Sequence, residues 1–300
     1  MNLRYAEELN EEALEAQASA QFDELARIGR EMISYGEIAG DLLALARGYN
    51  FLGNAKLHTG DGDSAERAYR SALKIFSQRG DRAGVARVVM NLGALAMEIR
   101  LDAADAKEQF SQALPVFEET GDRLRYAVAL ANLGEVYRLE GQYDVALENA
   151  CRALDIFEEL GDSDRETWQA VDIAHYHLLK RQHHDALRFL EIARKKLKHN
   201  RNPHWLCAYF EVWFLLAAQM HAWGPAAQLQ GFVDRYRLAH NVPRLQIMLP
   251  WLLPPIEHLD KRLPFDEVSR LRSEGAEFSV ARAHATATHI AQLVKKREVS

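Results

Sequence analysis

Four histidines lie close together in the sequence, and histidine is a common metal ligand and general base. They are His175, His177, His183 and His184. His175 and His177 are two residues apart, so on a helix their side chains point roughly 200° away from each other. His183 and His184 fall in a predicted turn just before Asp185. We interpret all four as polar groove and turn residues, and we predict neither a metal site nor acid–base catalysis here.

The sequence contains none of the common nucleotide or zinc motifs. No glycine begins a G-x-x-x-x-G-K-[ST] phosphate loop, and no G-x-G-x-x-G follows a strand-like segment. There is no H-E-x-x-H, and the two cysteines, Cys151 and Cys207, lie far apart in sequence. Both cysteines fit small core side chains in a reducing compartment. We expect no cofactor and no enzymatic activity.

The composition and net charge of the chain indicate which kinds of partner it binds and in which cellular compartment it is found. With 48% hydrophobic and 27% charged residues, the 300-residue chain has the composition of a globular protein. Its formal net charge of -6 gives no general attraction to nucleic-acid phosphates or anionic lipid. No apolar run reaches the ~18 residues of a membrane span, and the N-terminus lacks the apolar core of a signal peptide. We therefore expect a cytoplasmic protein that binds neither nucleic acid nor a membrane directly.

A Gly-Asp pair recurs along the chain at nearly constant intervals. The pairs begin at Gly40, Gly80, Gly121 and Gly161, with spacings of 40, 41 and 40 residues. Glycine readily takes the left-handed conformation that ends a helix, and an aspartate carboxylate accepts hydrogen bonds from the first N–H groups of the next helix. Each pair therefore predicts the end of one helix and the start of another.

Ladders of small residues run in phase with these pairs. Neighbouring members of a ladder are 40 or 41 residues apart: Gly53, Gly93, Gly134 and Ala174 in the first, and Ala65, Ala106, Ala146, Ala186 and Ala227 in the second. Small side chains at fixed positions let two helices approach closely. The spacing from Gly93 to Ala106 is 13 rather than 12. This difference predicts a one-residue insertion in the turn near Leu101 and Asp102.

The offsets between the ladders resemble the consensus of the tetratricopeptide repeat, which has small residues at positions 8, 20 and 27. Gly53 is followed 12 residues later by Ala65, and 7 residues after that by Ala72. The repeats here, of about 40 residues, are longer than the usual 34. The resemblance implies an all-α fold, a right-handed α-solenoid of stacked antiparallel helix pairs in which each repeat contacts only its neighbours.

We expect the repeat region to cover residues 1–240 and a small C-terminal helical cap to cover 241–300. An N-terminal helix pair at 1–39 caps the solenoid in this interpretation. Full repeats follow at 41–80, 81–121, 122–161 and 162–201, and a degenerate pair at 202–240. After residue 240 the period is lost and prolines, which interrupt helices, become frequent: Pro243, Pro250, Pro254, Pro255 and Pro264.

The last quarter of the chain is similar to the end of the repeat region in LuxR-type and AfsR-type signal-transducing ATPase regulators. The similarity rests on the run Ala-Ala-Gln-Leu-Gln-Gly at 226–231, on Glu277 and Phe278, and on the alanines of the following helix, Ala281, Ala283 and Ala285. Those regulators combine a nucleotide-binding switch with a helical repeat sensor. The resemblance implies a module that binds a protein or peptide within a bacterial transcriptional or signalling regulator. The alternative is a stand-alone scaffold or chaperone-type adaptor, and the sequence leaves a homo-oligomer open.

The tetratricopeptide resemblance also implies where a ligand binds. In such arrays the first helix of each pair lines the concave surface, and ligand contacts come from consensus positions 2, 5, 9, 12 and 13. With the first ladder as position 8, this places the site at Arg47, Asn50, Asn54, His58, Arg87, Met90, Glu98, Glu135, Arg138, Trp168, Val171, His175 and, in the degenerate pair, Tyr209. A peptide with an acidic group and a hydrophobic anchor would match this surface. The alternative is that the C-terminal cap or another domain covers the apolar positions, which would then belong to the core.

Overall fold

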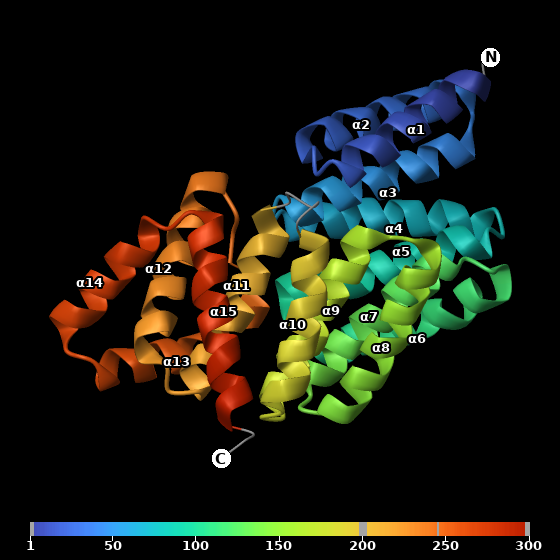
Figure 1. The fold of residues 1–300 in the computed structure, drawn as a ribbon. Helices are drawn as coiled ribbons and strands as arrows, with labels where there is room; N and C mark the ends of the chain where they lie inside the picture. The colour runs from blue at the N-terminus through green and yellow to red at the C-terminus, as the bar shows by residue number, and fades with distance from the viewer. Residues whose placement is uncertain (1–2, 198–202, 245, 298–300) are drawn as a thin grey trace. The chain divides into compact units, whose positions relative to one another are not determined.

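The computed structural model describes residues 3–197, 203–244 and 246–297, and these residues form helices and connecting turns without a strand (Figure 1). The chain divides into two compact units, Met1–Glu140 and Gly141–Ser300. The expected limits at residues 1, 201, 202 and 300 lie outside the described residues, and the expected division at residue 240 stays a prediction. None of the described helices is long and apolar enough to span a bilayer.

Unit 1 is a succession of helices joined by short turns. Its elements are α1 (Leu3–Ala18), α2 (Phe22–Ala39), α3 (Leu42–His58), α4 (Gly62–Gln78), α5 (Arg82–Leu95), the π-helical turn η1 (Ala96–Arg100), α6 (Ala103–Thr120) and α7 (Arg123–Leu139). Each helix packs against the next along the chain, as stacked antiparallel pairs require.

Unit 2 begins with the same arrangement, and towards its end it has the proline-containing helix α13 and the short helix α14. Its elements are α8 (Tyr143–Leu160), α9 (Ser163–Leu179), α10 (His183–Leu197), α11 (Pro203–Gln219), α12 (Trp223–His240), the 3-10 turn η2 (Gln246–Met248), α13 (Leu249–Arg262), α14 (Phe265–Ala276) and α15 (Val280–Arg297). The last three helices pack against α11 and α12 or against each other, and α15 also packs against α10.

The Gly-Asp pairs act as helix boundaries, which confirms the prediction from their spacing. The four glycines have φ between +66° and +68°, and each following aspartate caps the next helix. In the second pair, for example, Asp81 Oδ1 accepts a hydrogen bond from the backbone N–H of Gly84 at 2.8 Å.

A second series of left-handed turns falls between the Gly-Asp pairs. It lies at 40- or 41-residue intervals and is mostly not glycine: Ala20, Gly60, Leu101, Gly141, Arg181 and His221. These residues end the first helix of a pair, and the same turn geometry at Ala20 shows that α1 and α2 are joined in the same way as the later pairs.

The small residues of the ladders lie where helices meet. A Cβ atom on Gly53 would be 2.5 Å from the ring of Tyr69, and one on Gly93 would be 2.7 Å from the ring of Phe110. Ala65 and Ala72 are completely buried in the same cluster as Tyr69. The glycines therefore make room for an aromatic ring from the second helix of the pair.

The one-residue insertion is absorbed inside a helix. We expected it in the turn near Leu101 and Asp102, but α5 instead widens into the π-helical turn η1 over Ala96–Arg100. Leu101 then takes the left-handed conformation, and Asp102 caps α6 as the other aspartates do. The extra residue thus lengthens the helix and leaves the turn unchanged, as single-turn π-bulges commonly do.

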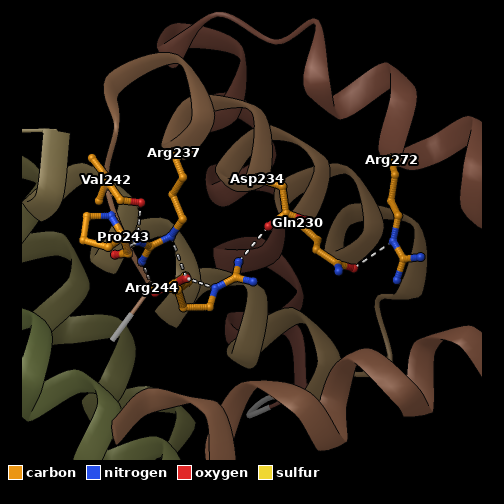
Figure 2. Close-up of polar contacts among 8 residues, drawn as sticks. Gln230, Asp234, Arg237, Val242, Pro243, Arg244 and Arg272 are labelled. Atoms are coloured by element: carbon orange, nitrogen blue, oxygen red, sulfur yellow. Dashed lines mark hydrogen bonds and ion pairs between the residues drawn. The ribbon is translucent and has the colours of Figure 1, made fainter. Parts of the chain in front are cut away.

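A buried ion network ties the segment after α12 to α11 and α12 (Figure 2). Glu211, only 5% exposed on α11, accepts from Arg237 Nη2 at 2.9 Å and from Arg244 Nε at 3.3 Å. Arg237 also donates to the carbonyl oxygen of Pro243 at 2.6 Å, and Arg244 pairs with Asp234 at 2.7 Å. The two arginines therefore share one buried carboxylate and hold the chain as it leaves α12.

Candidate ligand-binding face

A chain of side-chain amides links α1, α3 and α5 in unit 1. Asn91 Nδ2 donates to Asn50 Oδ1 and to Asn54 Oδ1, both at 2.9 Å. Asn54 in turn donates to Gln17 Oε1 at 2.9 Å and accepts from the Tyr69 hydroxyl at 2.9 Å. Because one amide NH₂ group lies between two amide oxygens, the network fixes the orientation of Asn50, Asn54 and Asn91.

Two groups of this network remain available to a ligand. Among the residues that the structure describes, Asn50 Nδ2 and Asn91 Oδ1 have no hydrogen-bond partner, and both side chains are half-buried. One is a donor and the other an acceptor. We call the surface formed by Arg47, Asn50, Asn54, Arg87 and Asn91 the amide face.

Arginines lie beside these asparagines, one from each first helix. Arg87 of α5 is half-buried over the ring of Phe76, at 5.8 Å from its centroid. Burial lowers the pKa of Arg87, as do the positive charges of Arg125 and Arg47. The negative charges of Asp81 and Asp122 raise the pKa of Arg87, but Asp122 is already paired with Arg125 at 2.6 Å. Neither Arg47 nor Arg87 forms an ion pair within the described ranges, so both retain positive charge for a ligand.

Carboxylates gather near the C-terminal ends of α5 and α7. Burial, and then the charge of Glu135, raise the pKa of Glu98 to about 7. Glu135 is paired with Arg138, whose Nε donates to Glu135 Oε2 at 2.7 Å. Glu98 has neither a hydrogen bond nor an ion pair with any other described residue. It lies near Tyr69, whose pKa is raised by burial and by the charge of Glu98.

Three further predicted residues of unit 1 lie apart from the amide face. His58 is exposed and stacks on Phe22 with 4.4 Å between ring centroids. Met90 packs against a cluster that includes Phe117. Arg138 was predicted as a ligand contact, but its side chain is fully buried in this structure, because Glu135 on the same helix holds it in the packed interior.

Most of the predicted site residues of unit 2 are buried within that unit. Trp168 is half-buried against Trp205, with ring centroids 4.5 Å apart. Val171 and His175 are each only 3% exposed, and the edge of Trp251 from α13 lies 6.3 Å from His175. Tyr209 is fully buried beside His284 of α15 at 5.6 Å. In this structure Val171, His175 and Tyr209 are therefore buried, with α13 beside His175 and α15 beside Tyr209, whereas Trp168 is only half-buried.

Sequence reasoning missed one residue of the amide face, Asn91, and two hydrogen-bond partners of Asn54, Gln17 and Tyr69. Asn91 lies one position after the consensus slot occupied by Met90. Gln17 lies on α1, in the N-terminal pair that was interpreted only as a cap, and Tyr69 lies on α4, the second helix of its pair. A signal was present, because Asn50, Asn91 and Asn132 recur at intervals of 41 residues. The consensus positions alone do not show which neighbouring amides bridge between helices.

The histidines of unit 2 make separate contacts. His177 Nδ1 lies 2.9 Å from Gln182 Oε1, and His183 Nε2 lies 2.9 Å from Gln219 Oε1. Over the described ranges, no three side chains of histidine, cysteine, aspartate or glutamate gather in a way that could hold a metal ion.

Known proteins with tetratricopeptide-type repeats resemble this chain in sequence and in fold. Residues 98–159 match the family model described as a tetratricopeptide repeat. No curated protein sequence matches the chain. The structure of BtubC (BKLC) from P. vanneervenii is similar with a TM-score of 0.55 and 19% identity, over 79% of this chain and 93% of that one.

Two regulatory proteins have a similar structure. The first is a Signal Transduction ATPase with Numerous Domains (STAND) protein with a tetratricopeptide repeat sensor from Pyrococcus horikoshii, with a TM-score of 0.55 and 14% identity over 95% of this chain and 42% of that one. The second is the Rap conjugation gene regulator of the plasmid pLS20 in complex with the Phr* peptide, with a TM-score of 0.51 and 14% identity over 88% of this chain and 76% of that one. At these identities the likeness concerns the fold, which is generally a non-catalytic interaction scaffold.

Proposed function

We propose that this chain, an all-α protein of tetratricopeptide-like repeats, binds a peptide or protein segment through the amide face of unit 1 and has no catalytic activity. The observation that carries the proposal is the pair of available groups on Asn50 and Asn91, held by the Asn54 network. A peptide unit presents one C=O and one N–H group. The Asn50 amide can donate to the former and the Asn91 oxygen can accept from the latter.

Charge selects the ligand further. Arg47 and Arg87 are half-buried and have no carboxylate partner in the described part of the chain. A guanidinium group binds a carboxylate with two parallel hydrogen bonds, and it does so more strongly where water is partly excluded. The ligand proposed here therefore carries an acidic side chain or a C-terminal carboxylate within reach of these two arginines.

The proposed setting is a bacterial transcriptional or signalling regulator in the cytoplasm. Support comes from the likeness in fold to a STAND protein with a repeat sensor and to a Rap regulator bound to a peptide. The net charge of -6 favours a protein or peptide ligand over nucleic acid. In this role the chain would be the sensor, and its ligand would be the signal.

Display of a random peptide library against the full chain tests the proposal. We expect selected peptides to be enriched in acidic residues and to bind at least ten times more weakly to the Arg87→Ala and Asn91→Ala variants. Arg67→Ala is the matched control, because Arg67 is exposed on α4 outside the amide face. Titration calorimetry of each folded variant measures the affinities. Equal affinity for wild type and for both amide-face variants would exclude this surface as the site.

A further inference from the structure

The C-terminal helix α15 buries little apolar surface for its length. Over Val280–Arg297 its buried residues are mainly alanines, with only two larger side chains: Ala283, Ala287, Ile290, Ala291 and Val294. Hydrophobic stabilisation scales with the apolar area removed from water, and alanine contributes the least of these side chains. The helix is therefore weakly held by packing compared with α11, whose buried side chains are mostly large.

The contacts that α15 makes with α10 and α11 are few and partly exposed. The ring of His284 lies 5.0 Å from the centroid of Phe210 and 5.6 Å from that of Tyr209. Near the other end of the helix, Lys295 Nζ pairs with Glu191 Oε1 of α10 at 3.0 Å. Both partners of this ion pair are more than 40% exposed, so it adds little to the stability of the contact.

Polar groups at this contact are buried without hydrogen bonds. Among the residues that the structure describes, the Tyr209 hydroxyl and His284 Nδ1 have no hydrogen-bond partner, although Tyr209 is 0% exposed. The indole N–H of Trp213 can donate to the Tyr209 oxygen, but an indole N–H cannot accept, so the Tyr209 O–H still lacks an acceptor. Buried unsatisfied groups destabilise the arrangement that buries them.

We propose that α15 docks reversibly, and that the surface beneath it binds an amphipathic helix of a partner protein in its place. We call this surface the α11 face and define it by Tyr209 and Phe210 of α11 together with Glu191 of the neighbouring α10. This inference concerns unit 2 and is independent of the ligand proposed for the amide face.

The docked α15 indicates the chemistry of the partner helix. It presents one face of alanine and β-branched residues, a lysine that reaches Glu191, and a polar group opposite Tyr209. A partner that places an oxygen acceptor opposite Tyr209 would satisfy a donor that α15 leaves unsatisfied. Such a helix would compete with α15 because it would give the Tyr209 O–H the hydrogen-bond acceptor that α15 does not provide.

The connection before α15 allows the helix to leave and return. Helix α14 ends at Ala276, and only residues 277–279 separate it from α15, which Ser279 caps through the backbone N–H of Arg282 at 3.2 Å. A link this short keeps an undocked α15 at high effective concentration near its own site. A competing helix therefore binds wild-type protein weakly and binds well once α15 is kept from docking.

A synthetic peptide of residues 280–297 tests this competition in the full chain. Ala287→Glu places a charge on the buried face of α15 and should undock it. We expect the labelled peptide to bind this variant at least ten times more tightly than wild type in fluorescence anisotropy. Ala285→Glu is the matched control, because Ala285 is exposed on the same helix, and it should behave as wild type. A peptide that itself carries Ala287→Glu should not bind.

Hydrogen exchange of the wild-type chain gives a second test that needs no variant. The amides of α15 should exchange at least ten times faster than those of α11. Equal protection of α15 and α11, or failure of the folded Ala287→Glu variant to bind the peptide, would overturn the proposal. A wild-type dimer in light scattering that is lost with Ala287→Glu would assign the α11 face to α15 of a second copy, and would overturn the partner-protein assignment.

Discussion

Gly231 of α12 and Gly275 of α14 lie where these two helices cross at backbone contact. A Cβ atom on Gly231 would be 2.0 Å from the carbonyl oxygen of Arg272, and one on Gly275 would be 1.9 Å from that of Gln228. Both obstacles are backbone atoms of the opposing helix, which cannot rotate away as a side chain can. Gly275→Ala should therefore lower the free energy of unfolding by ~3 kcal/mol through overpacking.

Gly224→Ala is the control for this substitution. Gly224 lies in the first turn of the same α12, and an added Cβ there would meet nothing within 4 Å. Alanine in a helix is favoured over glycine by ~0.5–1 kcal/mol, so this variant should be as stable as wild type or slightly more so. Urea denaturation followed by circular dichroism compares the two. A Gly275→Ala variant that unfolds at the same urea concentration as Gly224→Ala would show that the crossing is not tight.

The helix boundaries could be predicted from the sequence because their cause is local. A glycine that takes positive φ, followed by an aspartate that caps the next helix, needs no information from elsewhere in the chain. The crossing of Gly231 and Gly275 could not be predicted in this way. Its close contact joins Gly231 to Arg272, 41 residues later, and only the packed structure shows that pairing.

Only some residues of the amide face could be predicted, because the sequence shows the repeat register but not the contacts between helices. The repeat register located Arg47, Asn50 and Arg87 on first helices, since register depends on the spacing of small residues. It could not show that Asn91 bridges two other asparagines, because the bridge depends on the side-chain positions of two helices. Nor could it show that α15 covers Tyr209, since the period is lost before α15 begins.

The shared carboxylate of Glu211 should contribute strongly to the stability of unit 2. It is buried between Arg237 and Arg244, and Figure 2 shows both guanidinium groups turned toward the same point. Removing one member of a buried ion network leaves the remaining charges without compensation, at a cost of about 3–5 kcal/mol. We expect Glu211→Ala to lower the free energy of unfolding by roughly that amount in urea denaturation.

Two comparisons separate this effect from a general loss of charge. Glu257→Ala removes an exposed carboxylate from α13 and should change stability by less than ~0.5 kcal/mol. Glu211→Gln keeps the size of the side chain and one hydrogen-bonding oxygen. Its loss of stability should therefore lie between the losses of Glu257→Ala and Glu211→Ala. If Glu211→Ala cost no more than Glu257→Ala, the network seen in Figure 2 would make no net contribution.

The helix caps of the Gly-Asp pairs should each contribute a modest amount. Asp81 accepts from the N–H of Gly84 at 2.8 Å, and Asp81→Ala should cost ~1 kcal/mol in thermal or urea denaturation. Asp63 lies exposed in the first turn of α4 and caps nothing, so Asp63→Ala should cost no more than a few tenths of a kcal/mol, about the size of a favourable charge near a helix N-terminus. Equal losses at the two positions would contradict the capping role.

Glu98 should make the stability of unit 1 depend on pH near neutrality. Its pKa is raised from 4.5 to about 7 in the folded protein, because burial and the charge of Glu135 disfavour the ionised form. Between pH 4.5 and 7 the folded protein therefore keeps a proton that the unfolded chain has lost. The free energy of unfolding should fall as pH rises through this range, by ~3 kcal/mol at most, and this contribution should be constant above pH 7.

Glu98→Gln isolates this contribution, because glutamine is neutral at every pH and leaves the Glu135–Arg138 pair in place. Relative to wild type, the variant should be about equally stable near pH 4.5 and more stable at pH 8. Glu119→Gln is the control, since Glu119 is exposed and, among the described residues, forms an ion pair only with exposed Arg82. Urea denaturation of the three proteins at pH 5, 6, 7 and 8 measures the difference. A stability difference between Glu98→Gln and wild type that stays constant across this range would mean that Glu98 ionises in the folded protein as it does in the unfolded chain.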